Sequence, residues 1–147
     1  LWMIYQTKEL LHDIQAMLDI NRHLHGAVKL VGQVDHDQLP YWYSAADFYI
    51  TASHHEGSGY ALIEAMSCGC IPIATDIPSF NKITANGNYG FLYPAGDRDA
   101  LFKAMQKLAT IDRPVLSKAV LQYAADHLSF KAIASDLYNI CKKLLSE

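Results

Sequence analysis

Residues 54–76 read HHEGSGYALIEAMSCGCIPIATD, and this stretch decides the fold of the chain. It opens with a polar segment that carries Gly57 and Gly59, and it continues with residues at helical spacing over Tyr60–Ser67. The apolar run Ile71–Thr75 follows, and a short run of this kind is typical of a strand buried on both faces. We therefore predict a loop, a short helix and a buried strand in succession, which is the repeating unit of parallel α/β sheets.

Strand-like and helical patterns alternate along the rest of the chain. This alternation predicts a Rossmann-like, doubly wound parallel sheet in an α/β fold, formed by residues 1–147 as a single domain. Asp35 or Asp37, Asp97 and Ser129 are the candidate helix caps. The other predicted strands are Leu1–Tyr5, Ala27–Val31, Phe48–Thr51 and Gly90–Tyr93; the other predicted helices are residues 8–23, 38–45, 98–109, 114–127 and 130–145, with residues 78–88 as a loop that contains one helical turn around 80–84.

Composition narrows the functional classes. The chain has 147 residues, about half of them apolar, with a net charge of −3 and scattered Lys and Arg, so we expect a globular domain that does not bind nucleic acid. Three cysteines without disulfide spacing indicate a reducing compartment, and we expect a cytoplasmic location. No apolar run is long enough to span a bilayer. The strand-like start at Leu1 suggests a fragment of a longer protein.

The loop before the predicted helix marks the candidate site. In an open α/β sheet, ligands bind beyond the carboxyl ends of the strands, and residues 53–59 leave such an end. Glycines there let the backbone approach a ligand, and we expect both Gly57 and Gly59 to adopt dihedrals that other residues avoid. The amides of Ser58, Gly59, Tyr60 and Ala61 would open a helix N-terminus, which attracts phosphate.

Two carboxylates flank this helix N-terminus. Glu64, within the helix, could accept hydrogen bonds from both hydroxyls of a ribose, and Glu56, on the loop, could hold a sugar hydroxyl or stabilise positive charge at an anomeric carbon. A nucleotide sugar is the obvious ligand of this kind. Both glutamates could equally be solvated helix-terminal charges, a reading that the pattern leaves open.

Several other patterns admit an ordinary reading. Adjacent His54 and His55 point to opposite sides of an extended segment, so we expect no metal site and no bound cofactor. Gln33 and Val34 follow another strand at the same edge and could contact a nucleobase, or they form an ordinary turn. The apolar stripe of the last helix is more often core than a partner surface. It consists of Ile133, Leu137, Ile140, Cys141 and Leu144.

At these residues the chain resembles the C-terminal, donor-binding domain of GT-B retaining glycosyltransferases, the glycosyl transferases group 1 or family four. The family pattern of Glu, seven residues and Glu is matched by Glu56 and Glu64, and it is followed here by AMSCG and IPIATD. The segments Ser44–Ile50 and Gly90–Asp97 resemble two further family motifs, in the same order along the chain.

The resemblance implies an activity. A sugar would pass, with retention, from a nucleotide-diphosphate sugar to an acceptor such as a glycan or lipid, as in polysaccharide biosynthesis. Glu64 would bind the ribose, and Glu56, the catalytic candidate, would hold the donor sugar. The backbone of Gly57–Tyr60 would hold sugar and phosphates, and Gln33 and Val34 would lie near the base. No metal is essential in the family.

The chain departs from the family at several points. Ser58 and Tyr60 stand where the family often has Phe and an aliphatic residue. The family's first strand and helix of this domain are absent, and with them an Arg and a Lys that neutralise the diphosphate. We therefore expect the chain to be inactive without them and without the N-terminal acceptor domain. The lacking strand would be central in the sheet, so its neighbours close up, a symmetric partner fills the gap, or another segment supplies the strand. Peripheral membrane association of the longer protein and a homo-oligomer of this chain are left open.

Two alternatives remain. The chain could be a nucleotide-sugar or phosphate-binding module without transferase activity, or part of a related nucleotide-sugar enzyme such as a non-hydrolysing epimerase. A dehydrogenase is disfavoured because no G-x-G-x-x-G motif opens the first helix.

Overall fold

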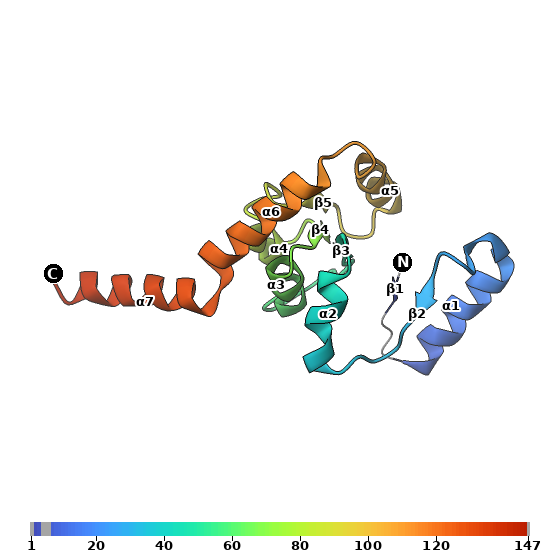
Figure 1. Ribbon diagram of the computed structural model, residues 1–147, viewed down its shortest axis with the longest axis horizontal. Helices are drawn as coiled ribbons and strands as arrows, with labels where there is room; N and C mark the ends of the chain where they lie inside the picture. Colours follow the sequence, from blue (N-terminus) through green and yellow to red (C-terminus); the bar gives the residue numbers. More distant parts are fainter. Residues whose placement is uncertain (1, 4–6, 147) are drawn as a thin grey trace. The chain divides into compact units, whose positions relative to one another are not determined.

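The computed structural model describes residues 2–3 and 7–146, and it divides the chain into two compact units, residues 1–39 and 40–147. The order of the elements along the chain can be followed from β1 to α7 in Figure 1. The first unit contains β1 (Trp2–Met3), α1 (Lys8–Ile20), the 3₁₀ helix η1 (Arg22–Leu24), β2 (Lys29–Leu30) and the 3₁₀ helix η2 (His36–Gln38). Strands β1 and β2 pair in parallel. Residues 1, 4 and 5 of the first predicted strand lie outside the described residues.

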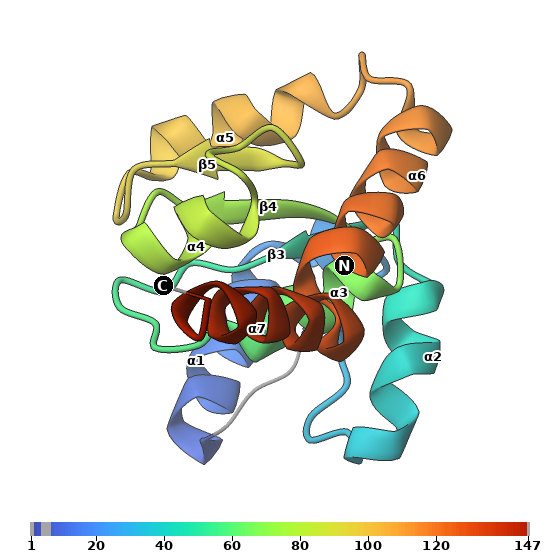
Figure 2. The same cartoon turned by 90° about the vertical axis from the view of Figure 1, so that its left-hand side faces the viewer.

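The second unit is organised around one parallel sheet with the strand order β3-β4-β5. Figure 2 shows these three strands side by side, with α5 next to β5. Its elements are α2 (Leu39–Ser44), β3 (Phe48–Ile50), α3 (Tyr60–Ser67), β4 (Ile71–Thr75), α4 (Pro78–Ile83), β5 (Phe91–Tyr93), α5 (Arg98–Lys107), α6 (Arg113–Tyr123), the π-helix η3 (Ala124–Leu128) and α7 (Phe130–Leu144).

Strand β4 is the centre of this sheet. All five of its residues are buried, as the continuous apolar run predicts. Its side chains pack with those of the surrounding helices in two hydrophobic clusters. The larger cluster includes Leu62 and Met66 of α3, Phe80 of α4 and Val120 of α6. The smaller cluster lies under α5 at Ala104. The predicted α/β class with a parallel, doubly wound sheet is therefore confirmed.

The entry to β5 depends on a glycine. Gly90 has φ of +154°, and a Cβ there would lie 2.5 Å from Pro72 Cγ and 2.7 Å from the Pro72 carbonyl oxygen. The chain can pass this close to β4 only without a side chain. Pairing between β4 and β5 begins one residue later on each strand, at Ile73 and Phe91. Pro72, which has no N–H to donate, therefore precedes the ladder between β4 and β5, while on its other side it is paired with Tyr49 of β3.

Helix caps agree with the sequence in part. The side chains of Asp97 and Ser129 cap α5 and α7 as predicted, accepting hydrogen bonds from Ala100 N at 2.9 Å and Ala132 N at 3.1 Å. Asp35 is the N-cap residue of η2, but its side chain makes no cap bond, and Asp37 lies inside η2; the expectation is therefore confirmed in position only.

Three expectations about helices need correction. The loop at residues 78–88 starts with a six-residue helix, α4. The helix expected over residues 114–127 starts one residue earlier and changes to the π-helix η3 at Ala124. The apolar stripe of α7 is not core: Ile133, Leu137, Ile140 and Leu144 are each more than half exposed.

The strands fall into two sheets. Within the described residues, β1 and β2 pair only with each other, and β3, β4 and β5 form the other sheet.

Candidate functional site

The loop between β3 and α3 lies at the carboxyl edge of the three-stranded sheet and is fixed at its start. Buried Thr75, the last residue of β4, donates its hydroxyl proton to the Ser53 carbonyl oxygen. The Tyr93 hydroxyl, at the end of β5, donates to the Thr51 carbonyl oxygen at 3.0 Å. Strands β4 and β5 therefore both hold the first residues of the loop, which lies at the sheet edge where open α/β folds bind ligands.

Gly59 sets the direction of α3. It is the N-cap residue, with φ of +65°, and a Cβ there would lie 2.5 Å from Ile83 Cδ1 and 3.4 Å from Phe80 Cε1. The prediction of special backbone geometry is confirmed at this position. It is wrong for Gly57, whose φ is not in the left-handed region and whose Cβ position has no atom within 4 Å. The helix start therefore depends on Gly59, which seats it against α4.

Glu56 is exposed and binds its own loop. Its Oε1 atom accepts hydrogen bonds from Gly57 N at 3.0 Å and from Gly59 N at 3.3 Å. We expected the amide of Gly59, with those of Ser58, Tyr60 and Ala61, to point outward and be available to a ligand. The structure shows instead that the Glu56 carboxylate already occupies the Gly59 amide.

Glu56 and Glu64 lie near a common neighbour, Tyr49 of β3. Burial raises the pKa of the Tyr49 phenol above its ordinary value, and the carboxylates of Glu56 and then Glu64 raise that pKa further. Glu64 itself is half-buried on the second turn of α3. Both glutamates, eight residues apart, are therefore close enough to Tyr49 to act on its phenol electrostatically.

Tyr49 is a member of this site that the sequence did not reveal. Its ring meets the ring of Tyr43 edge to face, with centroids 5.9 Å apart and an interplanar angle of 82°. Burial, the Tyr49 phenol and the Glu64 carboxylate, in that order, raise the pKa of Tyr43. The signal that could have identified Tyr49 is its position, two residues before Thr51, where β3 runs into the loop.

The remaining predicted residues lie in two places. Ser58, Tyr60 and Ala61 are exposed around the start of α3. Gln33 and Val34 follow β2 in the other unit, residues 1–39, so their predicted contact with the same ligand stays a prediction.

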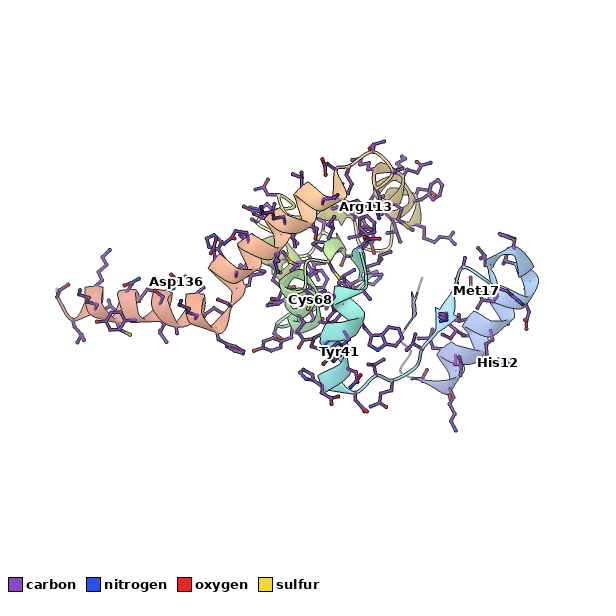
Figure 3. The ribbon with its side chains drawn as sticks, in the orientation of Figure 1. His12, Met17, Tyr41, Cys68, Arg113 and Asp136 are labelled. Carbon is purple, nitrogen blue, oxygen red and sulfur yellow. The ribbon has the colours of Figure 1, made fainter. Side chains whose placement is uncertain are left out.

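A shallow hollow of about 250 Å³ lies at the opposite, amino edge of the sheet, between Asp47, Gly69 and Arg113. Arg113, the first residue of α6, donates to Asp47 Oδ2 at 2.9 Å, and Figure 3 labels Arg113 and Cys68, another residue of the lining. The hollow adjoins the starts of β3 and β4, so it is separate from the loop that carries Glu56.

Among the described residues, no group of three or more His, Cys, Asp or Glu side chains is arranged to hold a metal ion. In the same part of the chain, no helix combines the length and the apolar character needed to cross a bilayer.

Two known proteins illustrate the similarity in sequence. A GDP-mannose:cellobiosyl-diphosphopolyprenol alpha-mannosyltransferase of Xanthomonas oryzae pv. oryzae is 35% identical over 88 residues, which are 60% of this chain and 23% of that protein. A phosphatidyl-myo-inositol mannosyltransferase of Mycobacterium leprae is 34% identical over 86 residues, 58% of this chain and 23% of that protein. The chain therefore spans about a quarter of the length of these curated relatives.

Two solved structures share the fold. Sucrose-phosphate synthase from Thermosynechococcus elongatus superposes with a TM-score of 0.78 and 25% identity, over 99% of this chain and 38% of that one. The pneumococcal O-GlcNAc transferase GtfA, solved with UDP and GlcNAc, gives a TM-score of 0.71 and 22% identity, over 99% of this chain and 29% of that one.

The parallel strands, the loop at their carboxyl edge and these neighbours define the chain as part of a GT-B fold. The family model described as Glycosyl transferases group 1 matches residues 17–125. The chain belongs to that family.

Proposed function

We propose that this chain is the donor-binding part of a retaining glycosyltransferase, which transfers a sugar from a nucleotide-diphosphate sugar to an acceptor such as a glycan or lipid. The observation that carries the proposal is the pair Glu56 and Glu64, which lie near Tyr49 on either side of the start of α3. Membership of the family and relatives named as mannosyltransferases support it.

Each side chain has a proposed role. Glu64 accepts hydrogen bonds from the ribose hydroxyls, because a half-buried carboxylate is a good acceptor for two neighbouring donors. Amides between Gly57 and Ala61 bind the diphosphate at the positive end of α3. Glu56 acts on the donor sugar as the catalytic candidate, and Gln33 and Val34 contact the base.

The acceptor side of the reaction lies outside this chain. We propose that a further N-terminal domain supplies the acceptor contacts, and that the Arg and Lys expected at the diphosphate come from the absent first strand and helix. Without these cations the leaving group is poorly stabilised, and electrostatic stabilisation is usually the largest contribution to catalysis. The chain by itself should then bind the donor without turnover, in a cytoplasmic setting and without a metal.

Binding of nucleoside diphosphates tests the proposal. Calorimetric titration with UDP and GDP should show binding of at least one of them, and Glu64→Ala should weaken it by about 1–3 kcal/mol, the cost of losing hydrogen bonds to a charged acceptor. Glu9→Ala is a matched control, because Glu9 is an exposed helix carboxylate in the other unit. Equal affinity of the wild type and Glu64→Ala would remove the ribose assignment, and no binding of either nucleotide by the wild type or by Glu56→Ala would remove the proposed function.

A further inference from the structure

The Glu56 carboxylate stands where an anionic ligand would be expected. One oxygen, Oε1, accepts from both Gly57 N and Gly59 N, so the two amides converge on a single negatively charged acceptor. A carboxylate oxygen and a phosphate oxygen are the same kind of partner for an N–H group. Each N–H can form one good hydrogen bond, so Glu56 and a diphosphate compete for them.

The same contact withholds Glu56 from a sugar. While Oε1 is bonded to its own loop, the carboxylate is directed at the backbone rather than at a ligand beyond it. The resting geometry therefore interferes with both roles that the proposed function assigns here. The Gly57 and Gly59 amides are occupied, and one oxygen of the Glu56 carboxylate is bonded to the backbone.

Only the Glu56 side chain has to move to change this. The start of the loop is held by Thr75 and Tyr93, and Gly59 at its end is buried against Ile83. Glu56 itself is exposed, so its side chain can rotate into solvent without disturbing the core. A side-chain rotation of an exposed residue is fast compared with catalysis.

We propose that Glu56 is the resting occupant of the Gly57 and Gly59 amides, and that the diphosphate of the donor displaces it and so directs its carboxylate to the donor sugar. This inference rests on the proposed function. Its consequence is selectivity between donor and product. A nucleoside diphosphate displaces Glu56 without offering it a new partner, whereas the complete donor offers the hydroxyls of the sugar.

The resting contact is tested first by NMR. In Glu56→Ala the Gly59 amide proton should move upfield and exchange faster with solvent, because it loses its acceptor. Gly59 is three residues from the substitution, so the change reports the hydrogen bond rather than the altered neighbour. The Leu62 amide, which donates to the Gly59 carbonyl oxygen at 3.0 Å, should keep its shift and show that α3 is intact.

The competition is tested by calorimetry. Glu56→Ala should bind UDP or GDP roughly three- to tenfold more tightly than the wild type, the range that the net contribution of one typical hydrogen bond provides. Glu56→Gln, a neutral acceptor of the same size, should lie between the two. Asp76→Asn is the control for loss of a negative charge, because exposed Asp76 lies at the same sheet edge and accepts from Asn81 Nδ2 rather than from the loop. It should change affinity by less than about twofold, as expected for screened exposed charges.

The outcomes separate this inference from the proposed function. Higher nucleotide affinity of Glu56→Ala, together with an upfield shift of the Gly59 amide proton, supports the inference. An unchanged Gly59 amide, or weaker nucleotide binding in Glu56→Ala, overturns it, while a loss in Glu64→Ala keeps the donor-binding function. If neither wild type nor Glu56→Ala binds a nucleoside diphosphate, both proposals are wrong. Binding by Glu56→Ala alone supports a resting occupant strong enough to exclude the nucleotide.

Discussion

Replacement of Gly59 by alanine should destabilise the second unit strongly. The new methyl group meets Ile83 Cδ1 at 2.5 Å, in a core where Ile83 is only 7% exposed, so a buried side chain or the helix start has to shift. Overpacking of this kind costs about 1–3 kcal/mol. A non-glycine residue at φ of +65° adds about 1–2 kcal/mol. The expected loss in the free energy of unfolding is therefore about 2–5 kcal/mol.

Urea unfolding followed by far-UV circular dichroism measures this loss, and Gly57→Ala is the control. Gly57 lies in the same loop, two residues earlier, but its Cβ position is open and its φ is not in the left-handed region. Its substitution should change stability by less than about 0.5 kcal/mol, as is usual for surface sites. The reasoning fails if Gly59→Ala costs under about 1 kcal/mol, or if the two variants lose the same amount.

Two further predictions concern a buried thiol and a strained turn. Burial, and then Cys68 and Asp47, raise the pKa of Cys70 from 9.0 to about 12, so the folded chain keeps a proton that the unfolded chain loses. Stability should therefore be full below pH 9 and fall above it, by about 0.8 kcal/mol between pH 7.5 and pH 9.5. Urea titrations at the two pH values should show a smaller loss of stability for Cys70→Ser than for the wild type. An equal loss in both proteins would contradict the raised pKa of Cys70. Ala85 has φ of +51°, so Ala85→Gly should raise the free energy of unfolding by about 0.5–1 kcal/mol. Thermal unfolding checks this against Ala109→Gly, which has no such φ to relieve and should lower stability.

The sequence predicted the elements around the site because their limits are set locally. Tyr60–Ser67 and Ile71–Thr75 have the predicted bounds. Gly59 marks the start of the helical apolar pattern, and Gly69 separates it from the continuous apolar run of the strand. The caps Asp97 and Ser129 were equally local signals. Where the pattern was weaker, as between residues 78 and 88, a short helix was missed.

The contacts of the site were harder to predict because they depend on distant residues or on single rotamers. Tyr49 comes within electrostatic range of both glutamates only in the folded chain, which no spacing within the sequence expresses. The bonds from the Gly57 and Gly59 amides to Glu56 depend on how one exposed side chain rotates. Amphipathic spacing in α7 identified an apolar face but not whether anything covers it.

The two hydroxyl bonds that fasten the start of the site loop divide it into parts with different freedom to vary. The backbone oxygens of Thr51 and Ser53 accept hydrogen bonds from Tyr93 of β5 and Thr75 of β4, so a deletion or insertion there would break the attachment. From His54 to Ser58 the side chains face solvent, and changes in length or charge would leave the sheet untouched. A family with this arrangement could vary its choice of sugar through residues at the tip of the loop, while the anchored residues at the start of the loop stay unchanged.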